Sequence, residues 1–185
     1  TNLNILCDEN CTDNKNRKII VAKILIVSAT NDKNLELAKD LQQILSDMNL
    51  STDIICLEDL KLPLFSSNVL VDEIQIDSLL KKMDKSNGLI FCSPEYNGGV
   101  PPVLSNAITW VTVKSEHWRQ AFIGKFSIIS TYSGGDGHRF ISAFRSQLEY
   151  MGTNVLARSI SVSKNKPLDI ESTKGILQGL IDIIN

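Results

Sequence analysis

The feature that most constrains the fold is the regular alternation of short apolar runs with longer amphipathic ones. Short runs rich in β-branched residues are typical of strands buried on both faces. Strands are expected at Ile19 to Val27, Asp53 to Leu57, Gly88 to Cys92, Lys125 to Thr131 and Asn154 to Val162. The intervening segments carry apolar residues at helical spacing. Helices are expected at Asn34 to Met48, Val71 to Met83, Pro102 to Val113, Phe140 to Met151 and Asp169 to Ile184.

This alternation predicts an α/β fold, a five-stranded parallel sheet with helices on both faces. The common arrangement with right-handed crossovers has the strand order 2-1-3-4-5, and its ligand crevice lies at the carboxyl ends of strands 1 and 3. Residues 19–185 are expected to form a single domain. Residues 1–18 are a polar leader that we expect to be a loosely ordered tail. The alternative for its Cys7 and Cys11 is a metal or redox pair.

Charge and hydropathy exclude several classes of partner. The net charge of −2 lacks the basic surplus of a nucleic-acid-binding protein. No apolar run approaches the ~20 residues that a membrane span needs. The leader lacks the basic-then-apolar pattern of a secretory signal, so we expect a cytoplasmic protein. Cys56 and Cys92 end apolar runs and are interpreted as buried small hydrophobic residues.

Three connections are expected to open at the same edge of the sheet, because each follows a strand at its carboxyl end. They are Ser28 to Asn34 (SATNDKN), Ser93 to Gly99 (SPEYNGG) and Tyr132 to Gly137 (YSGGDG). Glycine allows a ligand to approach the backbone closely. The first connection leads into a helix and offers hydroxyls and amides beside exposed N–H groups, as phosphate sites do. Its candidate residues are Ser28, Thr30, Asn31 and Asn34.

The second connection is long and stiff for a strand-to-helix turn, which favours a wall against a flat ligand. A rigid turn without function is the alternative. Residues 93–110, SPEYNGGVPPVLSNAITW, resemble the signature of the NADPH-dependent FMN reductase family, S/T-P-E-Y-N-G-S-x-P-G-x-L-K-N-A-I-D-W. Similar likenesses occur at Leu60 to Leu64, Ser133 to Gly137 and Leu148 to Gly152. The resemblance extends from about Val21 to Asn185.

The resemblance implies a flavodoxin-like three-layer sandwich that binds FMN and assembles as a homodimer or homotetramer. It places the flavin ring near Pro94, Glu95, Tyr96, Asn97 and Gly98, with Ser133, Gly134 and Gly135 at the other edge. NADPH or NADH would pass hydride to the flavin, which would reduce a quinone, an azo compound, a metal oxyanion or a free flavin. No catalytic side chain and no metal ligand is implied, because the flavin carries the chemistry.

The first connection departs from the family pattern. Val27 stands where the family has glycine, the loop has no arginine, and Asp32 falls where the family has serine. We expect Asp32 to cap the following helix, using N–H groups that a phosphate would use. Two alternatives to the reductase therefore remain. One is a flavodoxin-like binding or regulatory module with lost or weak FMN binding, and the other is a one-electron carrier.

Overall fold

The computed structural model describes residues 23–185. The predicted leader, the pair Cys7 and Cys11, and residues 19–22 of the first expected strand lie outside the described residues.

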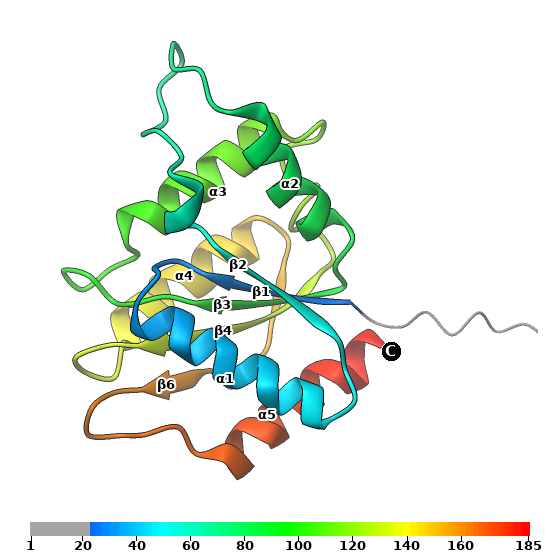
Figure 1. The fold of residues 1–185 in the computed structure, drawn as a ribbon, viewed down its shortest axis with the longest axis vertical. Coiled ribbons are helices and arrows are strands. Elements are labelled where there is room, and N and C mark those ends of the chain that lie inside the picture. The colour runs from blue at the N-terminus through cyan, green and yellow to red at the C-terminus, as the bar shows by residue number, and fades with distance from the viewer. Residues whose placement is uncertain (1–22) are drawn as a thin grey trace, which may run out of the picture.

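The described residues form a parallel sheet in the order β2-β1-β3-β4-β5, with β6 also paired to β4 (Figure 1). The predicted fold class and strand order are thereby confirmed. The strands are β1 (Ile24–Ser28), β2 (Thr52–Cys56), β3 (Gly88–Cys92), β4 (Phe126–Tyr132), β5 (Asn154–Val155) and β6 (Ile160–Val162).

The prediction of one continuous strand at Asn154 to Val162 is wrong, because the structure divides it into β5 and β6. β5 pairs with the start of β4, and β6 pairs with its end after a shift of register. Between them the guanidinium of Arg145 donates hydrogen bonds to the carbonyls of Val155, Leu156 and Ala157, at 3.2, 2.8 and 3.4 Å. The Arg145 side chain provides hydrogen-bond donors for the carbonyls at the interruption. The chain can therefore leave the sheet there without leaving these carbonyls unpaired.

Within residues 23–185, five α-helices cover the sheet, and their ends lie within two residues of the predicted ones. They are α1 (Lys33–Asp47), α2 (Glu73–Asp84), α3 (Pro102–Lys114), α4 (His138–Tyr150) and α5 (Ile170–Ile184), and a short 3-10 helix, η1, spans Glu58–Leu60. Helices α1 and α5 lie on one face, and α2, α3 and α4 on the other (Figure 1).

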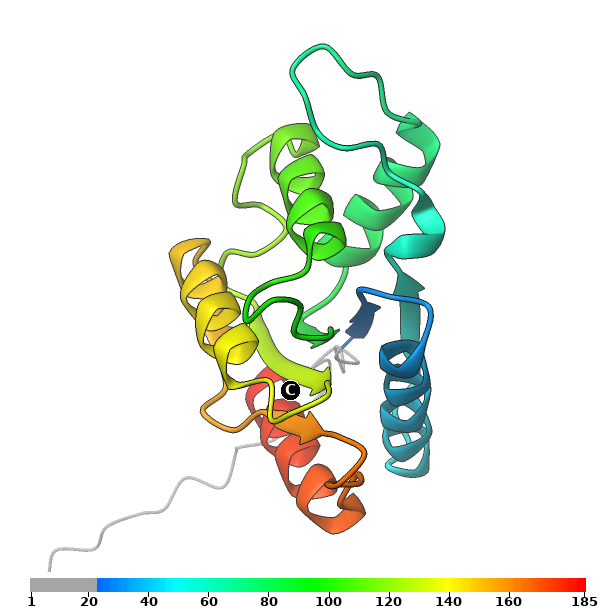
Figure 2. The same ribbon diagram turned by 90° about the vertical axis from the view of Figure 1, so that its left-hand side faces the viewer.

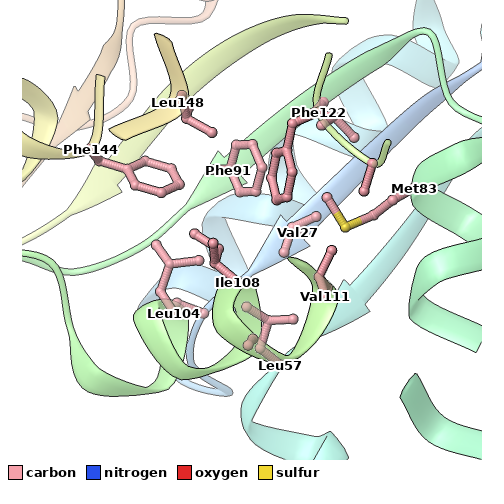
Figure 3. Packing of buried hydrophobic residues seen from close by; sticks show 14 of the residues in the cluster. Val27, Leu57, Met83, Phe91, Leu104, Ile108, Val111, Phe122, Phe144 and Leu148 are labelled. Carbon is pink, nitrogen blue, oxygen red and sulfur yellow. The ribbon is translucent and has the colours of Figure 1, made fainter. Parts of the chain in front are cut away.

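The core follows from strand periodicity, since successive side chains point to opposite faces. In β1, Leu25 and Val27 pack toward α2, α3 and α4, whereas Ile24 and Ile26 pack toward α1 and α5. Figure 3 shows the first of these clusters, in which Phe91 of β3 lies among side chains of α3 and α4. The rings of Phe91 and Phe144 meet edge to face with centroids 5.1 Å apart.

One residue of the expected apolar stripe of α2 faces solvent. Ile74 is 81% exposed, whereas Ile76, Leu79 and Met83 are buried. Ile74 shares its helical face with Asp77, three residues on, so the helical repeat directs it away from the core.

Candidate functional site

The carboxyl ends of three neighbouring strands lie at one level. Ser28 of β1 is in register with Cys92 of β3, which is in register with Ser130 of β4. The loops 28–34, 93–99 and 132–137 therefore leave the sheet at the same edge, as the sequence predicted. They lie at the left-hand side in Figure 1, and Figure 2 looks onto them.

The first loop is held by its own side chains. The hydroxyl of buried Ser28 donates to the Thr30 carbonyl at 2.7 Å, and the hydroxyl of buried Thr30 donates to the Asp32 carboxylate at 2.6 Å. The same Asp32 oxygen accepts from the Asn34 N–H at 3.3 Å. The prediction that Asp32 caps the helix is confirmed. Ser28 and Thr30 thus shape the loop from beneath, and any role in holding a cofactor stays a prediction.

Asn31 is the exposed one of the four candidate residues in this loop, and two carboxylates that the sequence analysis missed bind it. Its backbone N–H donates to Glu58 Oε2 at 2.8 Å, and its side-chain amide donates to Asp59 Oδ1 at 3.3 Å. Both carboxylates belong to η1, directly after β2. The pairing of Ser28 with Cys56 brings η1 beside the loop. The order of strands 1 and 2 was the available signal, since it predicts that the connection after β2 adjoins the first loop.

Asn34 joins the first loop to the end of β4. This residue is 1% exposed; its Oδ1 accepts from the Tyr132 N–H at 2.9 Å and its Nδ2 donates to the Tyr132 carbonyl at 3.1 Å. The Asn34 side chain therefore pairs with both backbone groups of Tyr132, as a neighbouring strand would. Asn34 was predicted as a cofactor ligand, and the contact the structure gives it is this structural one.

The second loop owes its stiffness to a tight turn. Tyr96 and Gly99 pair as an antiparallel bridge around Asn97 and Gly98, whose φ angles are 50° and 71°. Two positive φ angles at an Asn-Gly pair are typical of a type I′ turn. Pro94 is buried beneath it, whereas Tyr96 is 47% exposed and Asn97 and Gly98 face solvent. The turn thus holds a tyrosine and open backbone at the edge of the site.

Glu95 ties the second loop to the third. Its backbone N–H donates to the hydroxyl of Ser133 at 2.8 Å. Its carboxylate oxygen Oε2 accepts from the backbone N–H groups of Arg139 and Phe140, both at 3.0 Å. The cap residue of α4 itself, Gly137, has no side chain to do this. Glu95 therefore caps α4 from a distant loop, and its carboxylate is committed to that helix.

The third loop combines open and crowded glycines. A Cβ at Gly134 or Gly135 would meet no atom within 4 Å, and both residues are exposed. A Cβ at Gly137 would lie 2.7 Å from Thr131 Cγ2, and φ there is 64°. Gly137 is thus required by the fold. Gly134 and Gly135 leave space above the backbone, where a flat ring can approach closely.

The charges around the first loop are mainly negative. Asp32, Glu58 and Asp59 lie on it or bind it. Lys33 forms an ion pair with Glu36 at 2.6 Å. The hydrogen bond and the charge of Glu36 raise the pKa of Lys33. This balance differs from that of an ordinary phosphate site, which gathers positive charge or free N–H groups.

The buried thiols supply no nucleophile. Cys56 and Cys92 are buried, as predicted. Burial raises the pKa of Cys92 from 9.0 to about 12, and it also raises the pKa of Cys56. Thiolates are therefore scarce near neutral pH. Within residues 23–185, no three His, Cys, Asp or Glu side chains group as metal ligands would, and no helix is long and apolar enough to cross a bilayer.

Hollows lie both beside these loops and away from them. One of about 770 Å³ is at the opposite edge of the sheet, beside Lys23, Lys81 and Lys85. Another of about 320 Å³ adjoins the first loop, between Lys33, Tyr132 and Lys164. The loop site itself is an open edge, and its shape is defined by the exposed backbone of the second and third loops.

Comparison with known proteins supports a flavin site at this edge. A model of the NADPH-dependent FMN reductase family matches residues 22–167. A quinone reductase of Escherichia coli is 29% identical over 124 residues, which cover 65% of this chain and 60% of that protein. An uncharacterized protein of Mycoplasma pneumoniae is 25% identical over 138 residues, which cover 71% of this chain and 80% of that protein.

Solved structures support the fold. FerB, a flavoenzyme NAD(P)H:(acceptor) oxidoreductase from Paracoccus denitrificans, superposes with a TM-score of 0.71 at 18% identity, over 89% of this chain and 97% of that one. At this identity the likeness shows a shared architecture. The match to the family model over residues 22–167 shows the family.

Proposed function

We propose, from the premise that this chain belongs to the NADPH-dependent FMN reductase family, that it passes electrons from NAD(P)H through FMN to a quinone. The chain is an NAD(P)H-dependent flavin oxidoreductase with FMN as its cofactor. The observation that carries the proposal is the junction of three loops at one sheet edge. There an Asn-Gly turn and two open glycines leave backbone exposed on either side.

The ring-binding part of the site fits a flavin. An isoalloxazine is flat and has a polar edge of N–H and C=O groups. The turn at Asn97 and Gly98 offers exposed backbone to that edge, and Gly134 and Gly135 leave room for the ring itself. Tyr96, 47% exposed on the same turn, offers an aromatic surface beside it. The predicted ring contacts are thus assembled in one place, and their contact with FMN is our proposal.

The protein's own work in this reaction is positioning. A bound flavin supplies the capacity to accept hydride from NAD(P)H and to reduce an acceptor by two electrons. Glu95 and Ser133 hold the second and third loops together, so that the two sides of the ring site keep a fixed separation. The site needs no general base among the side chains. His138 is exposed, and its nearest carboxylate, Asp136, is 3.8 Å away.

A quinone is the acceptor that the relatives favour, since the Escherichia coli protein is a quinone reductase. The match spans 60% of that enzyme. Quinones are flat and uncharged, which suits an open, glycine-lined edge better than a metal oxyanion does, because the carboxylates nearby repel anions. Azo compounds and free flavins share the flat shape and are the comparison substrates. The cytoplasmic location stays a prediction from the sequence.

We also propose that the chain assembles as a homodimer or homotetramer. Support comes from an exposed apolar patch formed by Trp118, Ile123 and Tyr150, which are 48%, 58% and 69% exposed. The rings of Trp118 and Tyr150 lie 5.9 Å apart, with the guanidinium of Arg119 4.2 Å from the Trp118 ring. Aromatic residues with arginine are common at protein interfaces. Sedimentation analysis of the protein and of Trp118→Ser tests this assembly.

The function is tested by titrating the protein with flavin and following the visible spectrum, then adding NADPH and a quinone. We expect a perturbed flavin spectrum, bleaching by NADPH, and recovery of the oxidised spectrum with quinone. Gly135→Val should block the ring without disturbing the fold, because a side chain there meets open space. Gly175→Val, on α5, is the matched control, since Gly175 is also open. A protein that leaves the flavin spectrum unchanged would contradict the proposal.

A further inference from the structure

The first loop already holds anions of its own where a phosphate would bind. A phosphate at a helix N-terminus is normally held by free backbone N–H groups. Here the N–H of Asn31 donates to Glu58 Oε2 at 2.8 Å, and the N–H of Asn34 donates to Asp32 Oδ1 at 3.3 Å. Two donors that a phosphate would use therefore face carboxylates of the same chain.

The sheet places the backbone of Glu58 beside the first loop. The N–H of Leu57 donates to the Ser28 carbonyl at 2.8 Å, which extends the pairing of β2 with β1 beyond Cys56. Glu58 follows at once, and η1 is closed by Lys61 in the left-handed conformation. The next carboxylate, Asp59, holds the Asn31 side chain at 3.3 Å. The sheet and η1 therefore bring the backbone of Glu58 within reach of Asn31, and the exposed Glu58 side chain makes the contact.

The charge balance does not compensate a phosphate. Asp32, Glu58 and Asp59 contribute three negative charges. The adjoining hollow holds two lysines, Lys33 and Lys164, and Lys33 is paired with Glu36. A phosphate dianion that entered this loop would have to displace Glu58 and would lie close to the remaining carboxylates. Like charges at such distances repel, and salt screens this repulsion at exposed positions.

We propose that Glu58 occupies the phosphate position of the flavin site, so that the protein binds flavins through the ring and ribityl chain and barely distinguishes riboflavin from FMN. This inference rests on the proposed flavin site and specifies its ligand class. Glu58 is a specificity-determining residue in it. Removal of its charge leaves the Asn31 N–H with a weaker, neutral acceptor that a phosphate can displace, and it creates a preference for the phosphorylated flavin.

The test is a comparison of dissociation constants for riboflavin and FMN, measured by quenching of flavin fluorescence with the full-length protein. For the unchanged protein we expect the two constants to lie within about tenfold, because the phosphate gains no free N–H groups and meets like charges. In Glu58→Gln we expect FMN binding to tighten by about tenfold while riboflavin binding stays constant. Glu171→Gln is the matched control, because Glu171 is an exposed carboxylate on α5 paired only with Lys174.

Ionic strength provides a second readout that does not depend on a variant. In an ordinary phosphate site, added salt weakens FMN binding relative to riboflavin. Here added salt should strengthen FMN binding relative to riboflavin, since it screens repulsion. FMN binding more than about a hundredfold tighter than riboflavin, unchanged in Glu58→Gln, would overturn this inference alone. No binding of either flavin would overturn the proposed function and this inference with it.

Discussion

The side chain of Asn34 forms hydrogen bonds to both the N–H and the carbonyl of Tyr132, at 2.9 and 3.1 Å. This contact joins the start of α1 to the end of β4, 98 residues apart in the sequence. It fixes the position of the first loop relative to the third. The geometry of the proposed site therefore depends on a buried amide.

Replacing Asn34 by alanine should lower the free energy of unfolding by about 1–3 kcal/mol, because two partly buried backbone groups lose their partner. Urea denaturation of the variant and of Gln43→Ala measures the effect. Gln43 also lies on α1, but its hydrogen bond to Asp47 is exposed, so its loss should cost less than about 0.5 kcal/mol. A loss below about 1 kcal/mol for Asn34→Ala would show that water replaces the amide.

Glu95→Gln should destabilise the N-terminus of α4. The carboxylate accepts from two N–H groups of the first turn, and a charged cap contributes about 1 kcal/mol more than a neutral one. Hydrogen exchange at the amides of Arg139 and Phe140 should accelerate in this variant. Glu149→Gln, at the other end of the same helix, is the control and should leave these amides protected. Equal exchange in both variants would contradict the capping role.

Two glycines of the third loop should respond oppositely to alanine. Gly137→Ala places a Cβ 2.7 Å from Thr131 Cγ2 at a φ of 64°, so we expect a loss of about 1–3 kcal/mol from strain and overlap. Gly134→Ala meets no atom within 4 Å and should leave the melting temperature almost unchanged. Thermal unfolding of both variants measures the contrast. Similar melting temperatures would mean that the loop relaxes around Gly137.

Cys92 should make stability depend on pH in the alkaline range. Burial raises the pKa of its thiol from 9.0 to about 12 in the folded protein. The unfolded chain therefore loses this proton at lower pH than the folded one. The contribution of Cys92 is complete below pH 9 and is lost as the pH rises toward 12, by about 1.4 kcal/mol per pH unit.

Urea denaturation between pH 8 and 11 compares the protein with Cys92→Ala. The variant lacks this ionisation, so its stability should fall less steeply above pH 9, although it loses some packing at every pH. Parallel curves for the two proteins would show that the thiol titrates equally in both states.

The features that could be predicted from the sequence depend on neighbouring residues and on general rules of chain topology. The alternation of strands and helices predicted a parallel sheet, the rule of right-handed crossovers gave its order, and the residues after strands 1, 3 and 4 predicted which loops meet. Asp32 caps its helix as expected. This information is local, because helix caps and strand alternation involve residues a few positions apart.

The contacts within the site follow from the three-dimensional path of the chain. Glu58 reaches Asn31 across 27 residues, and Glu95 reaches Phe140 across 45. The sequence shows the carboxylates but not their partners, since these contacts depend on strand register and on the path of each loop. The interruption between β5 and β6 also involves a tertiary contact, because Arg145 of α4 donates hydrogen bonds to the carbonyls there. Local patterns thus specify the framework, whereas long-range hydrogen bonds to the backbone determine which N–H groups remain for a ligand.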